Sequence, residues 1–367
     1  MTLLVRDEAE IIDAQIAFHL NAGVDFVIAT DNGSQDGTPE ILESYVRDGY
    51  LLLLHEPVGV LRQAEWVTRM ARLAATDFGA DWVINSDADE FWWPRQGLLK
   101  EVFEAAPQGY GIVPGFHRPF VPRPIVDGAY FAERMIVRLS PQAPINDPAG
   151  AYRPYTKVAH RADPHVSVAR GAHMLLDSPL ETLPSWRPIE VLHFPIRNVE
   201  QCAHKAMLQW TGFVGSERGY GTAYHTKSYQ ARVAGLSREY YDSLAVDDEA
   251  LARGLADGSL VVDTRLRDAL RLLAPVSETD TGDDGSITGH ARRRFALPPS
   301  GSGRLQLAEP SIVDDAGVAV DVAVLGEAER IRQLRQLDAL EARLERCSRS
   351  RLAGTVRRLV GKDRSAA

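Results

Sequence analysis

The first hundred residues alternate between short apolar runs and longer stretches whose apolar side chains recur at helical spacing. Such runs are typical of buried strands, and the stretches between them predict amphipathic helices. Gly23 follows the first helix as a C-cap glycine, and Thr38 with Pro39 begins the second. The predicted strands span residues 2–5, 25–30, 51–54 and 81–86, and the predicted helices span residues 9–22, 38–49 and 61–78. Fully apolar strands alternating with helices indicate an α/β fold with a parallel sheet covered on both faces.

The pattern changes at about residue 109. Short β-like pieces with proline-rich connections extend to about residue 175, and residues 189–196 predict a strand that a helix follows. We therefore expect one domain over residues 1–225, in which residues 1–108 form the first half. The second half, residues 109–225, should contain mixed or antiparallel strands.

Three further segments complete the predicted organisation. Residues 226–275 predict a helical extension, and residues 276–316, rich in Asp, Gly, Ser and Pro, predict a flexible linker. Residues 317–367 predict an amphipathic helix with a basic tail. This helix fits a short coiled coil, a protein-docking helix or a peripheral contact with anionic lipid, and a solvated tail is the simpler alternative.

Composition narrows the class of protein. The chain has 367 residues and a formal charge of −9, which does not indicate a nucleic-acid-binding protein. Its two cysteines, Cys202 and Cys347, are far apart, which fits neither a disulfide framework nor a cysteine zinc site. No apolar run approaches the length of a membrane span. We expect a cytoplasmic protein, with the inner face of the cell membrane as a peripheral location.

Polar clusters follow three of the predicted strands, at residues 6–8, 31–34 and 87–89. In an open α/β sheet, ligands bind beyond the carboxyl ends of the strands, so these clusters should meet at one edge. In WVINSDADEFWWP, residues 82–94, three carboxylates crowd into four positions. Mg²⁺ and Mn²⁺ prefer carboxylate oxygens and substrate phosphates, so a divalent cation would offset the repulsion. An acidic surface turn is the alternative.

The ordered segments VRDEAEI, TDNGSQDGT and WVINSDADEF carry a resemblance to the GT-A glycosyltransferases, and to their family 2 group in particular. The resemblance covers about residues 1–210. It implies a Rossmann-like α/β/α sandwich that binds a nucleotide-diphospho-sugar and transfers the sugar to a glycan or lipid-linked acceptor. It also implies that residues 1–108 bind the nucleotide, with UDP-sugars as the expected donors, and that residues 109–225 face the acceptor.

The resemblance assigns the donor contacts. Asp31 matches the residue that accepts a hydrogen bond from the nucleobase, with a local turn capped by its side chain as the alternative. Arg6, Asp7 and Glu8 match the loop that lines the base pocket, although many members have Asn where Asp7 stands. Glu8 also suits a helix N-terminus. Arg62 matches a nucleotide contact, or is simply an exposed helical arginine.

Metal and diphosphate ligands also follow from the resemblance. Asp87 and Asp89 would bind Mn²⁺ or Mg²⁺, with Asp87 also near the donor. His193 matches the late histidine that completes the metal site, with a half-buried strand histidine as the alternative and His173 as its competitor. Arg197 would meet the diphosphate. Lys205 pairs with phosphate or is a solvated lysine.

The catalytic base is the least legible part of the sequence. Inverting transfer by direct displacement needs a carboxylate that takes the acceptor's proton. The resemblance implies that this base lies between the loop near Gly171 and the late histidine, where the available carboxylates are Asp177, Glu181 and Glu190, with Asp177 favoured. Core packing is the better interpretation of the aromatic residues 91–93. The candidates for the acceptor side are Trp210, Phe213 and Tyr220.

Two other functions stay open. A sugar-phosphate nucleotidyltransferase shares the sheet, the metal and the acidic pair, but needs a basic, glycine-rich loop after the first strand, which VRDEAEI lacks. An inactive scaffold that binds a nucleotide sugar and recruits partners through its C-terminal helix is the second alternative.

Overall fold

The computed structural model of the chain describes residues 1–56, 62–125, 129–141, 152, 156–182, 187–214, 223–274 and 295–298. All of these residues belong to one compact unit, residues 1–318.

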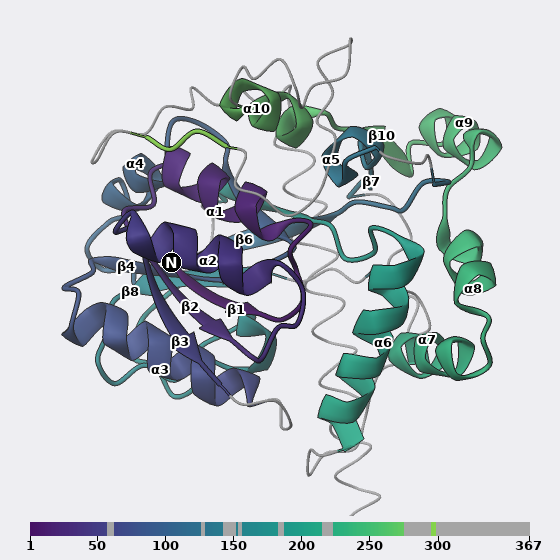
Figure 1. The fold of residues 1–367 in the computed structure, drawn as a ribbon. Helices are drawn as coiled ribbons and strands as arrows, with labels where there is room; N and C mark the ends of the chain where they lie inside the picture. Colours follow the sequence, from purple (N-terminus) through teal and green to yellow (C-terminus); the bar gives the residue numbers. More distant parts are fainter. Residues whose placement is uncertain are drawn as a thin grey trace, which may run out of the picture. The chain divides into compact units, whose positions relative to one another are not determined.

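Four parallel strands form the first half of an eight-stranded sheet (Figure 1). They are β1 (Thr2–Val5), β2 (Val27–Asp31), β3 (Leu51–His55) and β4 (Trp82–Asp87). Their order is β3-β2-β1-β4, and each neighbouring pair is parallel. The helices between them are α1 (Ile12–Asn21), α2 (Thr38–Arg47) and α3 (Gln63–Thr76). The predicted parallel α/β half is confirmed.

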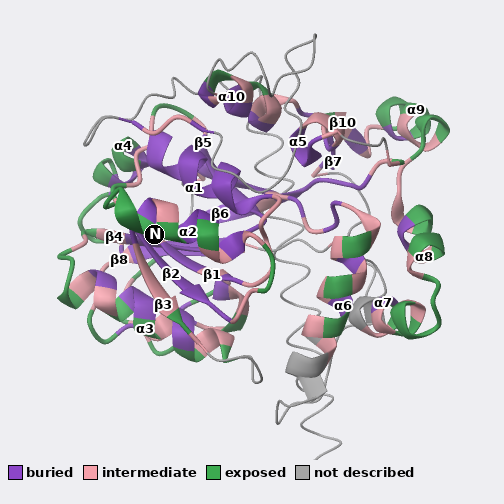
Figure 2. Ribbon diagram, viewed as in Figure 1, coloured by how far each residue is buried: buried purple, intermediate pink, exposed green. Residues whose placement is uncertain are grey.

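The helices cover both faces of this sheet. Side chains of α1 and α2 pack with β1 and β2 in one apolar cluster, and α3 packs on the other face. All ten residues of α1 are buried, whereas α2 and α3 keep exposed outer faces (Figure 2). A helix that is buried all round lies inside a core. The predicted α/β/α sandwich is therefore present.

Mixed strands complete the sheet. They are β5 (Glu90–Pro94), β6 (Ile112–Pro119), β8 (Thr156–Arg161) and β9 (Ile189–His193). The order continues from β4 as β8-β6-β9-β5, with β8 antiparallel to both of its neighbours and β6 parallel to β9. The mixed second half is confirmed. Not every β-like piece is a strand, because residues 165–175 contain a 3-10 turn, Arg170–Ala172.

The remaining elements pack around this sheet. They are α4 (Leu99–Glu104), α5 (Phe131–Arg134), β7 (Val137–Leu139), α6 (Val199–Val214), α7 (Ala223–Val233), α8 (Ser237–Leu244), α9 (Asp248–Ala256), β10 (Leu260–Val262) and α10 (Arg265–Leu273). The predicted extension, residues 226–275, returns to the sheet domain, since β10 pairs with β7 and α10 contacts α1. Leu270 is fully buried in the main core.

The predicted linker, apart from residues 295–298, and the predicted C-terminal helix lie outside the described residues. None of the described helices is long and apolar enough to cross a membrane.

Candidate active site

The sheet reverses its winding direction between β1 and β4. The chain leaves β1 for β2 on one side and returns as β4 on the other side, with Leu4 paired to Asp87. Open α/β sheets bind ligands in the crevice at such a switch point, beyond the carboxyl ends of the strands. Asp7 follows β1 and Asp89 follows β4, so the clusters predicted from the sequence flank this switch point, which is called the crevice below.

The loop after β1 is fastened to the loop after β2. Three successive backbone N–H groups donate to side chains of the second loop, at 2.9–3.0 Å: Asp7 to Ser34 Oγ, Glu8 to Thr38 Oγ1 and Ala9 to Asp36 Oδ2. The Asp7 carboxylate accepts a bond of 2.7 Å from the Gln35 N–H in return. Asp7 has a φ of 53°, a left-handed conformation that Asp tolerates better than most residues. These bonds hold the Asp7 side chain toward the crevice.

Asp31 is buried at the end of β2. Its Oδ1 accepts the Ser34 hydroxyl at 2.5 Å and the Ser34 N–H at 3.2 Å. This is the local turn that the sequence offered as an alternative. Its Oδ2 lies 4.0 Å from His55 Nδ1. The contact to a nucleobase stays a prediction.

Asp87 ends β4 and forms an ion pair with Lys157 on β8, at 2.6 Å. The same Lys157 ammonium lies 3.0 Å from Glu90 Oε1. The Lys157 side chain is 1% exposed. Burial alone would lower the pKa of Lys157, but Asp87 and Glu90 outweigh it and raise that pKa, so the lysine is a permanent cation.

Asp89 lies in the turn between β4 and β5 and has different partners. Its Oδ2 is 2.5 Å from Lys205 Nζ on α6 and 3.7 Å from His193 Nε2 at the end of β9. Burial alone would raise the pKa of Asp89, but Lys205, His193 and Arg197 hold it well below its usual range. The turn thus gives each of the two aspartates, Asp87 and Asp89, a lysine of its own.

Three histidines lie close to this acidic cluster. The His117 ring is 4.8 Å from the His193 ring, and His117 Nε2 is 3.0 Å from Glu90 Oε1. Burial lowers the pKa of His117 to about 4 and that of His173 to about 3, so both are neutral near neutral pH. His173 Nδ1 contacts the Thr156 carbonyl at 2.8 Å. Of the two predicted ligand candidates, His193 is the one that approaches Asp89.

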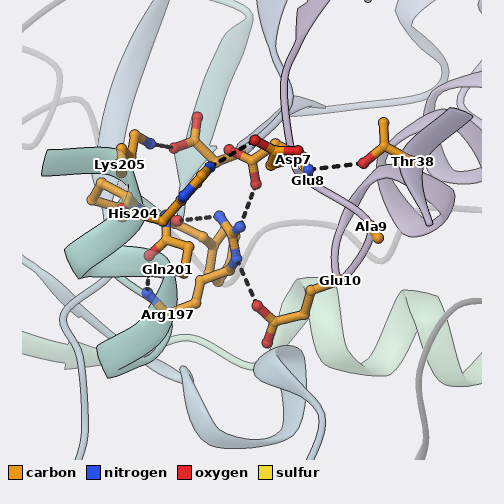
Figure 3. A network of polar contacts seen from close by, with 12 residues as sticks. Asp7, Glu8, Ala9, Glu10, Thr38, Arg197, Gln201, His204 and Lys205 are labelled. Atoms are coloured by element: carbon orange, nitrogen blue, oxygen red, sulfur yellow. Dashed lines mark hydrogen bonds and ion pairs between the residues drawn. The ribbon is translucent and has the colours of Figure 1, made fainter. Parts of the chain in front are cut away.

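Arg197 precedes α6 and is enclosed by the acidic loop after β1 (Figure 3). Its guanidinium binds Glu8, Glu10 at 3.2 Å and the Phe194 carbonyl at 3.3 Å. The side chain is 1% exposed, so we do not retain the predicted diphosphate contact for Arg197. It fastens α6 to the crevice instead. His204 on α6 reaches Asp7 at 2.6 Å, on the same side as Lys205.

The three candidate bases differ in their surroundings. Glu190 is fully buried between Arg118, at 2.6 Å, and Arg265, at 2.8 Å, and these arginines hold its pKa low against the effect of burial. The Glu181 carbonyl accepts the N–H of Ile112 at the start of β6. This position lies at the opposite end of the strands from the crevice. Asp177 is exposed beyond a short hairpin that packs on α3. Glu190 and Glu181 are therefore remote from the crevice, and a catalytic role for Asp177 stays a prediction.

The outlying candidates are placed as follows. Arg62 is exposed and pairs with Glu65 at 3.6 Å, which fits the surface interpretation. Residues 91–93 are buried in the main core, as the packing interpretation predicted. Trp210 stacks on Tyr229 of α7 with ring centroids 4.3 Å apart. The side chains of Phe213 and Tyr220 lie outside the described residues.

This arrangement does not fit a resident divalent cation. Among the residues that the structure describes, no three His, Cys, Asp or Glu side chains are grouped to hold a metal ion. A cation bound to Asp89 would lie close to the Lys205 ammonium, and one bound to Asp87 would lie close to the Lys157 ammonium, so each would meet charge repulsion. The Mn²⁺ or Mg²⁺ expected from the resemblance stays a prediction.

No protein-family model matches this sequence, and no curated protein matches it. Among solved structures, S. aureus TarS 1–349 is 12% identical over 68% of this chain and 75% of that chain, at a TM-score of 0.31. The structure of its complex with UDP-GlcNAc is 12% identical over 68% of this chain and 76% of that chain, at a TM-score of 0.30. Mannose-1-phosphate geranyltransferase from Thermus thermophilus is 13% identical over 74% of this chain and 77% of that chain, at a TM-score of 0.22. Such TM-scores support no conclusion about this chain, whose fold and site rest on its own geometry.

Sequence reasoning missed Lys157 altogether. The residue stands in TKVAHR, one of the pieces that the sequence predicts as β-like. A lysine inside a buried strand needs an ionic partner, and this was the available signal. The identity of that partner, Asp87, comes only from the pairing of β8 beside β4.

Proposed function

We propose that this protein transfers a sugar from a nucleotide-diphospho-sugar donor to a glycan or lipid-linked acceptor, at the crevice between β1 and β4. The observation that carries the proposal is the switch point itself. Carboxylates that follow β1 and β4 meet the basic side chains of β8 and α6 there. A site of mixed charge at a switch point suits a ligand with both hydroxyl groups and phosphates.

The chemistry needs positive charge at the leaving group. Cleavage of a sugar–phosphate bond leaves a nucleoside diphosphate with additional negative charge, which a fixed cation stabilises more strongly than it stabilises the donor. Lys205 is the basic residue best placed for this role, because its side chain is 29% exposed while Lys157 and Arg197 are enclosed. Asp177, Glu181 and Glu190 have no part in the proposal.

The loop after β1 argues against a nucleotidyltransferase. A triphosphate substrate needs backbone N–H groups and basic side chains that cradle its phosphates. In this loop the N–H groups of Asp7, Glu8 and Ala9 are all used by side chains of the neighbouring loop. Asp7 and Glu8 would also repel phosphate. A donor that carries only a diphosphate, held near β4 and α6, fits these residues better.

A nucleotide-sugar panel tests the proposal. Purified full-length protein would be incubated with UDP- and GDP-sugars, and nucleoside diphosphate and pyrophosphate would be measured. We expect one donor to release its nucleoside diphosphate. Asp89→Asn should lower this release at least about tenfold, because it removes the charge that positions Lys205. Asp25→Asn removes an exposed carboxylate at the other end of the strands and is the matched control.

Two outcomes would contradict the proposal. Pyrophosphate release would indicate a nucleotidyltransferase. Donor binding without release, in the presence of membrane extracts that contain lipid-linked glycans, would favour the inactive scaffold.

A further inference from the structure

We propose that Lys157 and Lys205 supply the positive charge for which the sequence predicted a divalent cation, so that the donor diphosphate binds without a metal. This inference rests on the proposed function. It follows from the partners of the acidic residues 87–90, since two lysines from distant parts of the chain contact three carboxylates there.

Lys157 is the fixed member of the pair. Its ammonium lies 2.6 Å from Asp87 and 3.0 Å from Glu90, and strand β8 holds it inside the sheet. A metal ion that took Asp87 would leave this lysine with one carboxylate in a buried position. Charges in such positions are costly unless they are paired. Lys157 therefore acts as a positioning residue that keeps Asp87 and Glu90 in place.

Lys205 is the member that can touch a ligand. An ammonium has three N–H donors, and one of them reaches Asp89 at 2.5 Å. Because the side chain is partly exposed, its other donors can face a diphosphate in the crevice while Asp89 stays paired. Mg²⁺ binds carboxylate oxygens at about 2.0–2.1 Å. A metal ion bound to Asp89 Oδ2 would therefore lie close to the Lys205 ammonium, and the two positive charges would repel each other.

Arg197 explains why Lys205 stays at this position. The guanidinium binds Glu8 and Glu10 and anchors the chain directly before α6. Two turns further along the helix, His204 contacts Asp7 beside Lys205. The α6 helix is thus fastened to the loop after β1 at two points, which directs Lys205 at the turn after β4.

The test is the binding of UDP and GDP to the full-length protein, measured by titration calorimetry in EDTA and again in Mn²⁺. We expect one nucleotide to bind in EDTA with a Kd within about threefold of its value in Mn²⁺. Lys205→Met should weaken this binding at least about tenfold, and Lys205→Arg should restore part of it. Lys100→Met is the matched control, because Lys100 pairs with Asp25 on the exposed surface at the other end of the strands. We expect it to bind as the wild type does.

Two results overturn the inference and are distinguishable. Binding that occurs only with Mn²⁺ would refute the metal-free site and leave the proposed function intact. Failure of every nucleotide to bind under both conditions would refute the proposed function as well. Because the comparison in EDTA uses the wild-type chain, it is decisive even if Lys205→Met does not fold. Paramagnetic resonance adds a second readout, in which the wild type should leave the signal of free Mn²⁺ unchanged.

Discussion

Replacement of Lys157 by methionine should destabilise the fold strongly. The substitution keeps most of the side-chain volume and removes a cation that is 1% exposed and 2.6 Å and 3.0 Å from two carboxylates. Asp87 keeps a weak contact with Gln63, at 3.4 Å, and is partly exposed. Glu90 is almost fully buried, so it bears most of the loss. Removal of one partner from a buried ion pair costs about 3–5 kcal/mol.

A double-mutant cycle separates the lost ion pair from lost packing. The free energy of unfolding would be measured by urea titration of the wild type, Lys157→Met, Glu90→Gln and the double variant. Glu90→Gln removes the carboxylate that Lys157→Met leaves without its cation. The double variant should therefore be at least about 1 kcal/mol more stable than the sum of the two single effects predicts. Lys100→Met removes an exposed ion pair and should cost less than about 1 kcal/mol.

The reasoning would be refuted by a Lys157→Met variant that unfolds within about 1 kcal/mol of the wild type, the range of exposed pairs. It would also be refuted by strict additivity in the cycle. In either case Glu90 and Asp87 would not depend on Lys157 for their charge.

Three further predictions concern other buried or remote groups. His19 donates through Nδ1 to the Gln15 carbonyl and accepts the Trp92 N–H, and burial lowers its pKa to about 4 from 6.5. The unfolded chain therefore takes up a proton first as the pH falls from 6.5 to 4, and stability should decrease by up to about 3 kcal/mol. His19→Leu should reduce this dependence of the free energy of unfolding on pH, measured by urea titration across the same pH range. Glu190→Gln should lower stability by about 3–5 kcal/mol because it leaves arginines buried without their carboxylate, yet nucleotide binding measured by calorimetry should persist. Glu181→Gln should keep sugar transfer within about twofold of the wild type, and a larger loss would make this residue a candidate base again.

Much of the first half of the fold could be predicted from local sequence patterns. Apolar runs and helical spacing predicted β1 to β4 and the helices between them, because parallel strands are buried on both faces and carry a strong apolar signal. The same rule placed Asp7, Asp31 and Asp87 at one edge, since parallel strands end together. The structure of residues 165–175 was harder to predict, because a short apolar run does not distinguish a strand from an irregular hairpin.

The sequence by itself determined the parallel half of the sheet and the strand ends at which its acidic residues gather. Tertiary structure decided which charges neutralise them. Lys157 lies 70 residues from Asp87, and Lys205 lies 116 residues from Asp89. No local periodicity encodes such pairs, which arise only when β8 inserts beside β4 and α6 is fastened by Arg197. Glu190 became a candidate catalytic base for the same reason. Its arginine partners on β6 and α10 become neighbours only in the folded chain, so its ion pairs could not be predicted.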